Sequence, residues 1–457
     1  MEIRTKRLIY VASITLLLIA ISRIVEQDII SQDPRDFMVV YLSTRAWMAG
    51  RAPYDPAVIV DEARKVSGTL YQAALHSVIV RVALYPPSCF PLVAPLAALP
   101  WKLALRIELV LSAIAYAWML WLCAMRLNGL KRLYFLSFAL AFAPFHSAFS
   151  IANLSALAVP TVCAAVLWVD SCWLGAAIFL ALATALKPQV AIVFLLHFLL
   201  TRRWKPFFTS AGLTGAVFLT SALWMKWHGV ARLMQYRNNL NEMVSPLGNN
   251  PNAILLHGAP NFTLFNVQPL AFWFLHDLTA ALIVSYVFFF VLLIAYGAIT
   301  STTAGRVFPG IQETQLLALA ALCTFIAWFQ QFYSAVSLLF VILWAVQAWE
   351  RRLAKGILIS AMVFLPPLSK LPAIVRLIRF VLGRTHADIT PAVLRAALFR
   401  RGLPETMQLT FPELLAYVLP ICFVVGSAVC LALDMGLNIF RLRLYRSPDV
   451  TGSTRVK

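Results

Sequence analysis

The sequence predicts an all-α, polytopic membrane protein of about eleven or twelve transmembrane helices, because about 20 helical residues cross a bilayer core of about 30 Å. Hydrophobic residues make up 61% of the 457 residues, charged residues make up 12%, and the mean hydropathy is +0.80. The apolar runs recur from Leu8 to Leu433, without the short alternating strands of a membrane β-barrel. The net charge of +19 comes from short Lys and Arg clusters between these runs, as the positive-inside rule expects, so nucleic acid is not an expected partner.

The first membrane helix is predicted at residues 8–25, behind a basic N-terminus that contains Arg4, Lys6 and Arg7. This start is similar to a signal peptide, but no small-x-small cleavage site follows the apolar run, so we interpret it as an uncleaved helix. Its basic flank keeps the N-terminus in the cytoplasm. Residues 26–83 then form an extracytoplasmic first loop.

That loop is predicted to contain short helices lying along the membrane interface. Asp33 followed by Pro34 is typical of an N-cap and a first helical residue, and Ala49 followed by Gly50 is typical of the matching helix end. A second, amphipathic helix is predicted at residues 56–67.

Residues 84–349 are predicted to form the membrane core, and residues 350–457 the C-terminal helices and a cytoplasmic tail of a single domain. The stretch at residues 84–101 carries Pro86, Pro87, Pro91, Pro95 and Pro100, which predict a broken or partly re-entrant helix. Further apolar segments are expected at residues 103–125, 133–149, 154–169, 173–186, 190–200, 207–224, 278–300, 314–329, 332–349 and 411–433.

Three basic clusters can all lie in the cytoplasm if the proline-rich stretch does not complete a crossing. These clusters are Arg126/Lys131/Arg132, Arg202/Arg203/Lys205 and Arg351/Arg352/Lys355. The same registration places Asn153, the Lys187-Pro188 break, the loop at residues 227–277 and Gln330-Gln331 on the outer side, with Asp36.

Asp36 is the first candidate for chemistry. On helical spacing Asp36 and Ser43 share one face of the first loop helix, while Tyr41 and Arg45 line a neighbouring face, so a carboxylate, a hydroxyl and an aromatic ring can point into one cleft. The alternative is structural, because an acid in a first turn favours the positive end of the helix dipole and can bond back to the cap. The residues of this segment leave both readings open.

Polar residues farther along the chain are candidates for substrate contacts. Lys187 lies between two apolar segments, so it is expected to face a cavity, an anion or an interface, or else to extend to the membrane surface. Arg237 could bind a phosphate, and Asn250 could bind sugar hydroxyls, although exposed arginines and turn asparagines are also common.

Neither a metal site nor a cofactor is predicted. The seven cysteines include no close pair and are expected to be buried small hydrophobic residues. The histidines show no metal-ligand spacing, and only His146 and His257 are kept as candidates for a cleft.

Several short motifs follow one another in a characteristic order along most of the chain. They are Asp36-Phe37 with Tyr41, Gly50 and Pro53-Tyr54-Asp55, then Tyr85-Pro86-Pro87, Pro95-Leu96, Leu99-Pro100, Asn153, Lys187-Pro188 and Arg202-Arg203-Trp204. This order resembles the GT-C class of multi-span glycosyltransferases, specifically the family of polyprenol-phosphate-mannose-dependent mannosyltransferases. The resemblance implies a GT-C-like fold and a catalytic base at Asp36, with Tyr85, Asn153 and Lys187 among the residues that contact substrate.

Two positions depart from this family pattern. Relatives often have glycine and glutamine shortly before the asparagine that matches Asn153, where this chain has Ser150-Ile151-Ala152. They also often carry histidines where this chain has Gln330-Gln331, which we keep as substrate-binding candidates.

Together these observations predict an inverting glycosyltransferase in a bacterial-type inner membrane, with its active site facing the periplasm or exterior. The expected partners are a polyprenyl-phosphate donor carrying a hexose such as mannose, a lipid or glycan acceptor, and membrane lipids. A lipid transporter or flippase is the alternative from another class, although internal pseudo-symmetry is not visible in the sequence. The Gln330-Gln331 departure leaves a third possibility, a catalytically inactive relative that acts as an assembly partner.

Overall fold

The computed structural model describes residues 3–30, 33–77, 83–229, 234–242, 255–256, 259–260, 264, 266–303, 313–325, 332–365 and 411–445. These residues are almost entirely helical, as predicted. The strands in the described part are the two-residue pair β1 (Leu255–Leu256) and β2 (Ala259–Pro260), which run antiparallel. The chain is therefore an all-α membrane protein.

The N-terminal third consists of one long helix, several short ones and a second long helix. They are α1 (Ile3–Arg23), the π-helix η1 (Ile24–Ile30), α2 (Arg35–Met48), α3 (Pro56–Val66), α4 (Gly68–His76), α5 (Cys89–Ala97) and α6 (Trp101–Met125).

The remaining helices follow α6 along the chain and pack largely against one another. They are α7 (Gly129–Leu140), α8 (Ala143–Ser150), α9 (Ser155–Trp168), α10 (Trp173–Leu186), α11 (Pro188–Leu200), α12 (Trp204–Trp227), α13 (Met234–Glu242), α14 (Gln268–Leu275), α15 (Leu278–Thr303), α16 (Glu313–Cys323), the 3-10 helix η3 (Phe332–Leu338), α17 (Leu339–Gln347), α18 (Arg352–Ser360), the 3-10 helix η4 (Ala361–Phe364) and α21 (Phe411–Tyr445). One buried apolar core extends from Leu16 in α1 to Met435 in α21.

Five helical stretches in the described residues are long and apolar enough to cross a membrane. They are residues 101–125, 129–150, 204–227, 278–301 and 418–440. Tryptophans stand about 30 Å apart along α6 (Trp101 and Trp121) and along α12 (Trp204 and Trp224), which is the spacing of the two interfaces of a bilayer. Their positions agree with a multi-pass membrane protein.

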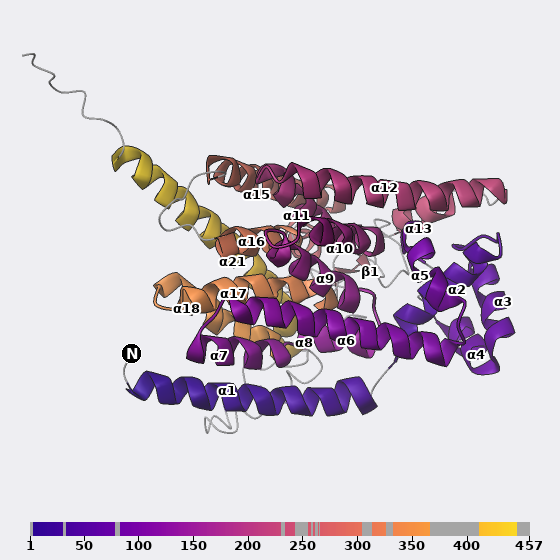
Figure 1. The fold of residues 1–457 in the computed structure, drawn as a ribbon, viewed down its shortest axis with the longest axis horizontal. Helices are drawn as coiled ribbons and strands as arrows, with labels where there is room; N and C mark the ends of the chain where they lie inside the picture. The colour runs from indigo at the N-terminus through magenta and orange to yellow at the C-terminus, as the bar shows by residue number, and fades with distance from the viewer. Residues whose placement is uncertain are drawn as a thin grey trace, which may run out of the picture.

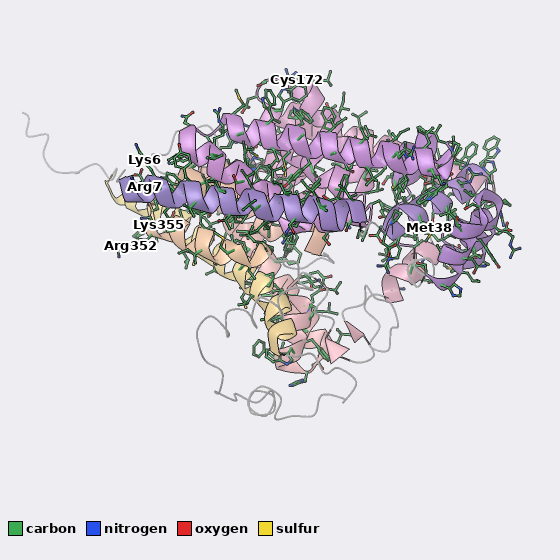
Figure 2. All side chains as sticks on the ribbon, turned by 90° about the horizontal axis from the view of Figure 1, so that it is seen from below. Lys6, Arg7, Met38, Cys172, Arg352 and Lys355 are labelled. Carbon is green, nitrogen blue, oxygen red and sulfur yellow. The ribbon has the colours of Figure 1, made fainter. Side chains whose placement is uncertain are left out.

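The two ends of the molecule differ in chemistry. Figure 1 shows α6 and α12 running along most of its length, with α2, α3, α4 and α5 gathered beside their ends on the right. In Figure 2 the basic residues Lys6, Arg7, Arg352 and Lys355 lie at the left end, whereas Met38 of α2 lies at the other. We call the end that carries these four basic residues the basic end, and the end that carries α2 the Asp36 end.

Short helices set the depth of the Asp36 end. α9, α10 and α11 have 14, 14 and 13 residues, so each is about 20 Å long, whereas α6 and α12 have 25 and 24 residues and are about 36 Å long. The Arg126 guanidinium donates to the carbonyl of Leu167, which precedes Trp168 at the end of α9. This end of α9 therefore lies beside the C-terminal end of α6. The other ends of these short helices therefore stop well short of the ends of α6 and α12 at the Asp36 end.

Aromatic contacts hold the first-loop helices over this region. The rings of Phe37 and Trp101 are stacked with centroids 5.6 Å apart, and those of Trp47 and Trp224 are also 5.6 Å apart. The Trp224 indole N–H donates to the Trp47 carbonyl at 2.9 Å. Helix α2 is thus fixed between α6 and α12 where these helices reach the Asp36 end.

The predicted elements are largely confirmed, with some changes at their ends. The amphipathic helix at residues 56–67 is α3, which Asp55 caps by accepting from the Ala57 N–H at 2.9 Å. The proline-rich stretch forms only the nine-residue α5, about 14 Å long and too short to cross a bilayer. The segment expected at residues 133–149 is two helices, α7 and α8, with Pro144 in the first turn of α8.

The predicted N-cap at Asp33 is wrong. The N-cap position of α2 is Pro34, and no side chain caps it. The Asp33 carboxylate instead forms a salt bridge of 2.8 Å with Arg35 at the surface. The helix end at Gly50 is confirmed: Gly50 has a positive φ of +66°, and a Cβ there would lie 2.5 Å from the His228 ring.

Candidate active site

The first turn of α2 rests on the turn between α8 and α9. The backbone N–H of Asp33 donates to the Ser150 carbonyl at 2.8 Å, and that of Asp36 donates to the Ile151 carbonyl at 3.3 Å. Ala152 in this turn has a positive φ of 48°, which lets the chain reverse direction tightly. Two segments far apart in the sequence are therefore joined through their backbones.

Asn153 follows in the same turn and contacts Asp36 directly. Its Oδ1 accepts a hydrogen bond of 2.8 Å from the Ser155 N–H at the start of α9, so its amide nitrogen must face the other way. That nitrogen donates to Oδ2 of Asp36. Both side chains are buried, with 8% of Asp36 and 1% of Asn153 exposed, so the carboxylate is fixed in position with only a narrow exposure to solvent.

Lys187 approaches the same carboxylate from the break between α10 and α11. Pro188 has no N–H to continue the α10 hydrogen-bond ladder, and Lys187 has φ −144° and ψ 74°, outside the helical region. Lys187 is 7% exposed, and its Nζ lies 5.2 Å from the centroid of the Tyr85 ring. Its positive charge interacts with the Asp36 carboxylate.

The segment that carries Tyr85 is hydrogen-bonded to the end of α10 and to Tyr54. The Ser88 hydroxyl donates to the Ala185 carbonyl at 2.8 Å, close to the end of α10, and the Tyr54 hydroxyl donates to the Tyr85 carbonyl at 2.9 Å. Sequence reasoning did not select Ser88 or Tyr54 as supports of the site. Tyr54 belongs to the Pro53-Tyr54-Asp55 motif, and Ser88 directly follows Tyr85-Pro86-Pro87. These positions in the sequence could have identified both residues.

Burial is the main influence on the acidity of Asp36. Desolvation raises its pKa above the ordinary carboxylate value, while the hydrogen bond from Asn153 and the positive charges of Lys187 and Arg35 lower it. A carboxylate with a raised pKa accepts a proton more readily than an exposed one. The surroundings therefore suit Asp36 to general-base chemistry.

Four of the predicted site residues lie together: Asp36, Tyr85, Asn153 and Lys187. Tyr41 and Arg45 lie farther along α2 in packing contacts. The Tyr41 hydroxyl donates to the Leu99 carbonyl at 2.8 Å, and Arg45 donates to the Ala97 carbonyl at 3.1 Å.

The remaining predicted residues belong to the loop at residues 227–277 and to the stretch before η3. Arg237 is on α13, a helix that reaches the site region through the rings of Tyr236 and Tyr54, 5.1 Å apart. Asn250, His257, Gln330 and Gln331 lie outside the described residues.

A second carboxylate of the first loop, Glu62, was not selected from the sequence. Its side chain is 4% exposed and lies 2.8 Å from Arg51, 2.8 Å from Lys65 and 3.8 Å from Arg45. Glu62 and Lys65 are three residues apart on a predicted helix, a spacing that favours contact between the two side chains, and this could have identified Glu62 from the sequence. Because three cations surround Glu62, its charge is compensated, and its contacts join α2 to α3.

A cavity lies at the basic end, away from Asp36. It has a volume of about 680 Å³ and is lined by Arg126, Leu127, Asn128, Leu130, Lys131, Glu313, Thr314, Gln347 and Trp349. We place the candidate chemistry at Asp36 because the cavity's acid, Glu313, is paired with Arg126 and Arg203, whereas Asp36 has an amide donor and a lysine beside it. Within the described ranges, no group of three or more His, Cys, Asp or Glu residues could hold a metal ion.

Comparison with known proteins adds one finding. No curated protein and no solved structure matches the chain. Residues 83–295, however, match the family model of Glycosyltransferase family 87. The matched stretch contains Tyr85, Asn153 and Lys187, and Asp36 comes to them from outside it. The match and the apolar helices together support a membrane glycosyltransferase.

Proposed function

We propose that this protein is an inverting glycosyltransferase that transfers a hexose from a polyprenyl-phosphate donor to a lipid or glycan acceptor at the extracytoplasmic face. The resemblance seen in the sequence favours mannose. The observation that carries the proposal is the Asp36 carboxylate, which accepts from Asn153 and lies within the field of Lys187. A base and a cation are the two groups that this reaction needs.

In this reaction Asp36 is the general base. As an acceptor hydroxyl attacks the anomeric carbon, its proton passes to the Asp36 carboxylate, and a new carbon–oxygen bond forms. The bond between the anomeric carbon and the phosphate oxygen breaks, and polyprenyl phosphate leaves with the electron pair. Attack from the face opposite the leaving group inverts the anomeric configuration.

Lys187 is the group that holds the donor phosphate. Negative charge develops on the phosphate as the bond to the sugar breaks, and a cation in a water-poor site stabilises that charge strongly. Lys187 is only 7% exposed, lies beside Tyr85 and interacts with Asp36, so both groups can act on one donor sugar. The phosphate held by Lys187 would lie on one face of the anomeric carbon, and the acceptor hydroxyl activated by Asp36 on the opposite face. Arg237, on α13, is a further candidate for the phosphate.

The depth of the site suits a lipid-linked donor. Asn153 and Lys187 lie at the ends of helices about 20 Å long, within the span of the longer α6 and α12. The phosphate of a donor anchored by a polyprenyl chain remains close to the bilayer, and an acceptor hydroxyl would come from the aqueous side. Tyr41, Arg45, Asn250, Gln330 and Gln331 remain candidates for contacts to the sugar or acceptor.

The test is a transfer assay with the purified protein and a panel of polyprenyl-phosphate sugars. We expect transfer of one hexose with inversion at the anomeric carbon, and loss of transfer in Asp36→Asn. Donor binding without transfer to any acceptor in the panel would favour an inactive assembly partner. Transfer from a nucleotide sugar instead of a lipid-linked sugar would contradict the proposed donor.

The side of the membrane is tested separately. The proposed orientation places the Asp36 end outside, in a bacterial-type inner membrane, and the basic end in the cytoplasm. In a cysteine-free background, Trp227→Cys, at a position 88% exposed at the end of α12, should react with an impermeant thiol reagent added from outside. Arg352→Cys at the basic end should react only after the membrane is opened, and the reverse pattern would invert the topology.

A further inference from the structure

Asp28 and His146 form a buried pair that the proposed chemistry does not use. Nδ1 of His146 lies 2.7 Å from Oδ2 of Asp28, and Nε2 lies 2.7 Å from the Leu140 carbonyl oxygen. The two side chains are only 4% and 9% exposed. The sequence singled out His146 as a candidate for a cleft, and the structure places it in α8, bonded to Asp28 and not to the Asp36 carboxylate.

The hydrogen bonds of this pair define its protons. A carbonyl oxygen only accepts, so Nε2 of His146 carries a hydrogen. A further hydrogen lies between Nδ1 and Asp28, so the pair as a whole has no net charge. Oδ1 of Asp28 is buried and has no hydrogen-bond partner among the described residues, which makes Asp28 dependent on His146.

The pair joins the end of α1 to α8. Asp28 belongs to η1, directly after α1, and η1 packs against α8. The Phe145 ring beside His146 is stacked on Tyr116 of α6, with ring centroids 3.6 Å apart and an angle of 8° between the planes. α8 is therefore held from two sides.

The C-terminal end of α8 leads directly to the candidate base. Ser150 and Ile151 accept the backbone bonds from Asp33 and Asp36, and Asn153 bonds the Asp36 carboxylate. A displacement of α8 would therefore move both the start of α2 and the amide that orients the carboxylate. Lys187 and Tyr85 lie on other segments and would keep their places.

We propose that Asp28 and His146 are positioning residues for Asp36, because they anchor the α8–α9 turn against which the carboxylate is oriented. The expected loss of transfer rate rests on the proposed function. The expected loosening of the contacts between α2 and the α8–α9 turn rests on the structure alone. The two consequences are measured separately.

The mechanical test is hydrogen exchange on His146→Gln in the full-length protein. With its amide nitrogen on the Leu140 carbonyl, the introduced glutamine would turn its oxygen toward the Asp28 carboxylate, and the anchor would be lost. We expect the amides of Asp33 and Asp36 to exchange at least about tenfold faster than in the wild type. His197→Gln is the matched control, because His197 is also fully buried and bonds a side chain, the Tyr296 hydroxyl at 2.5 Å, but lies in α11.

Conservative partners test the hydrogen bond itself. In Asp28→Asn, the introduced amide can donate to Nδ1 of His146 while Nε2 still donates to Leu140, so slow exchange should be retained. In the double variant Asp28→Asn/His146→Gln, the introduced asparagine can donate to the side-chain oxygen of the introduced glutamine, and slow exchange should be largely restored. Equal acceleration in His146→Gln and His197→Gln, or no restoration in the double variant, would overturn the proposal.

The kinetic test separates this proposal from the proposed function. His146→Gln should lower kcat for sugar transfer by about tenfold to a hundredfold, as misplacement of a catalytic group does, with donor KM within about twofold of the wild type. A change confined to donor KM would contradict a role in positioning Asp36. If the wild type transfers no sugar at all, the proposed function fails, while the exchange data still decide whether the pair anchors the turn.

Discussion

The two ends of this molecule both carry clusters of charged side chains, but the clusters are built differently. At the basic end, Glu313 lies 3.0 Å from Arg203 and 3.5 Å from Arg126, and these side chains are 23–33% exposed. At the Asp36 end, the carboxylate is 8% exposed, its hydrogen-bond donor is the neutral amide of Asn153, and Lys187 acts on it electrostatically. The first acid is neutralised by arginines, whereas the second remains able to accept a proton.

The difference shows why neither the presence of a cavity nor charge density identifies the candidate site. The cavity of about 680 Å³ lies beside Glu313, where salt bridges between partly exposed groups are ordinary surface contacts. Burial of a carboxylate without a neutralising arginine is costly, and groups buried in this way cluster at functional sites. The same substitutions made at both ends should therefore have unequal effects.

Asp36→Asn should have the largest effect. Asparagine keeps the size of the side chain but cannot take a proton from the acceptor, so the transfer rate should fall by about a hundredfold or more while thermal stability changes little. The measurement is sugar transfer from the polyprenyl-phosphate donor under saturating conditions.

Asp33→Asn and Asp55→Asn are the controls for this change. Asp33 is at the surface with Arg35, and Asp55 caps α3, a position that asparagine also fills well. Near-normal turnover in Asp36→Asn, or a larger loss in either control, would remove Asp36 from the mechanism.

Lys187→Met should come next. Loss of a buried cation from the donor phosphate should weaken donor binding by about tenfold to a hundredfold, since hydrogen bonds to charged groups contribute about 1.5–3 kcal/mol. Donor affinity can be measured by titration of the purified protein with the lipid-linked sugar.

Lys131→Met at the basic end is a matched control for this substitution. Lys131 Nζ also lies over an aromatic ring, 5.0 Å from the centroid of Trp349, against 5.2 Å for Lys187 and Tyr85. Donor affinity should be unchanged in Lys131→Met. Equal weakening by both substitutions would indicate a general effect of removing a lysine.

Asn153→Ala should lower the maximal rate by about tenfold, because it removes the amide that orients Asp36, and should also change the pH dependence of the rate. Asp36 must be ionised to act as a base, so the rate falls as the pH drops through its pKa, which burial raises above the ordinary carboxylate value. The Asn153 hydrogen bond lowers that pKa, so its removal should move the acid limb of the kcat profile to higher pH. Lys187→Met should shift the limb in the same direction, and an unmoved limb in both variants would mean that a different group titrates.

Glu313→Gln should have the smallest effect. It makes the same carboxylate-to-amide change at the basic end, where the salt bridges to Arg126 and Arg203 are partly exposed. We expect a loss of about 0.2–1 kcal/mol in the free energy of unfolding, smaller at high salt, with kcat and donor KM unchanged. Denaturant unfolding at two salt concentrations measures it, and a loss of turnover comparable to that of Asp36→Asn would invalidate the distinction between the two ends.

Local signals predicted much of the Asp36 end. The Pro and Gly residues around α2 and α3 and the Lys187-Pro188 break act within a few residues of themselves, so their effects could be read from the chain. The prediction of an Asp33 cap was wrong because other contacts replace the cap. The Asp33 N–H donates to the distant Ser150 carbonyl, and the Asp33 carboxylate pairs with neighbouring Arg35. Helical periodicity likewise placed Tyr41 and Arg45 on one face of α2, but it could not show that they would contact Leu99 and Ala97.

By itself, the sequence determined that this chain is a helical membrane protein, where its basic clusters lie and where many of its helices begin and end, because hydropathy, charge and helix-breaking residues act over one or two turns. Only the tertiary structure decided which acid of the first loop has its charge balanced by several cations and which is left able to accept a proton. Glu62 meets three cations, while Asp36 meets Asn153 from 117 residues away. Such partners are brought together by the packing of α2 against the turn between α8 and α9, and neither spacing nor composition in a single chain carries that information.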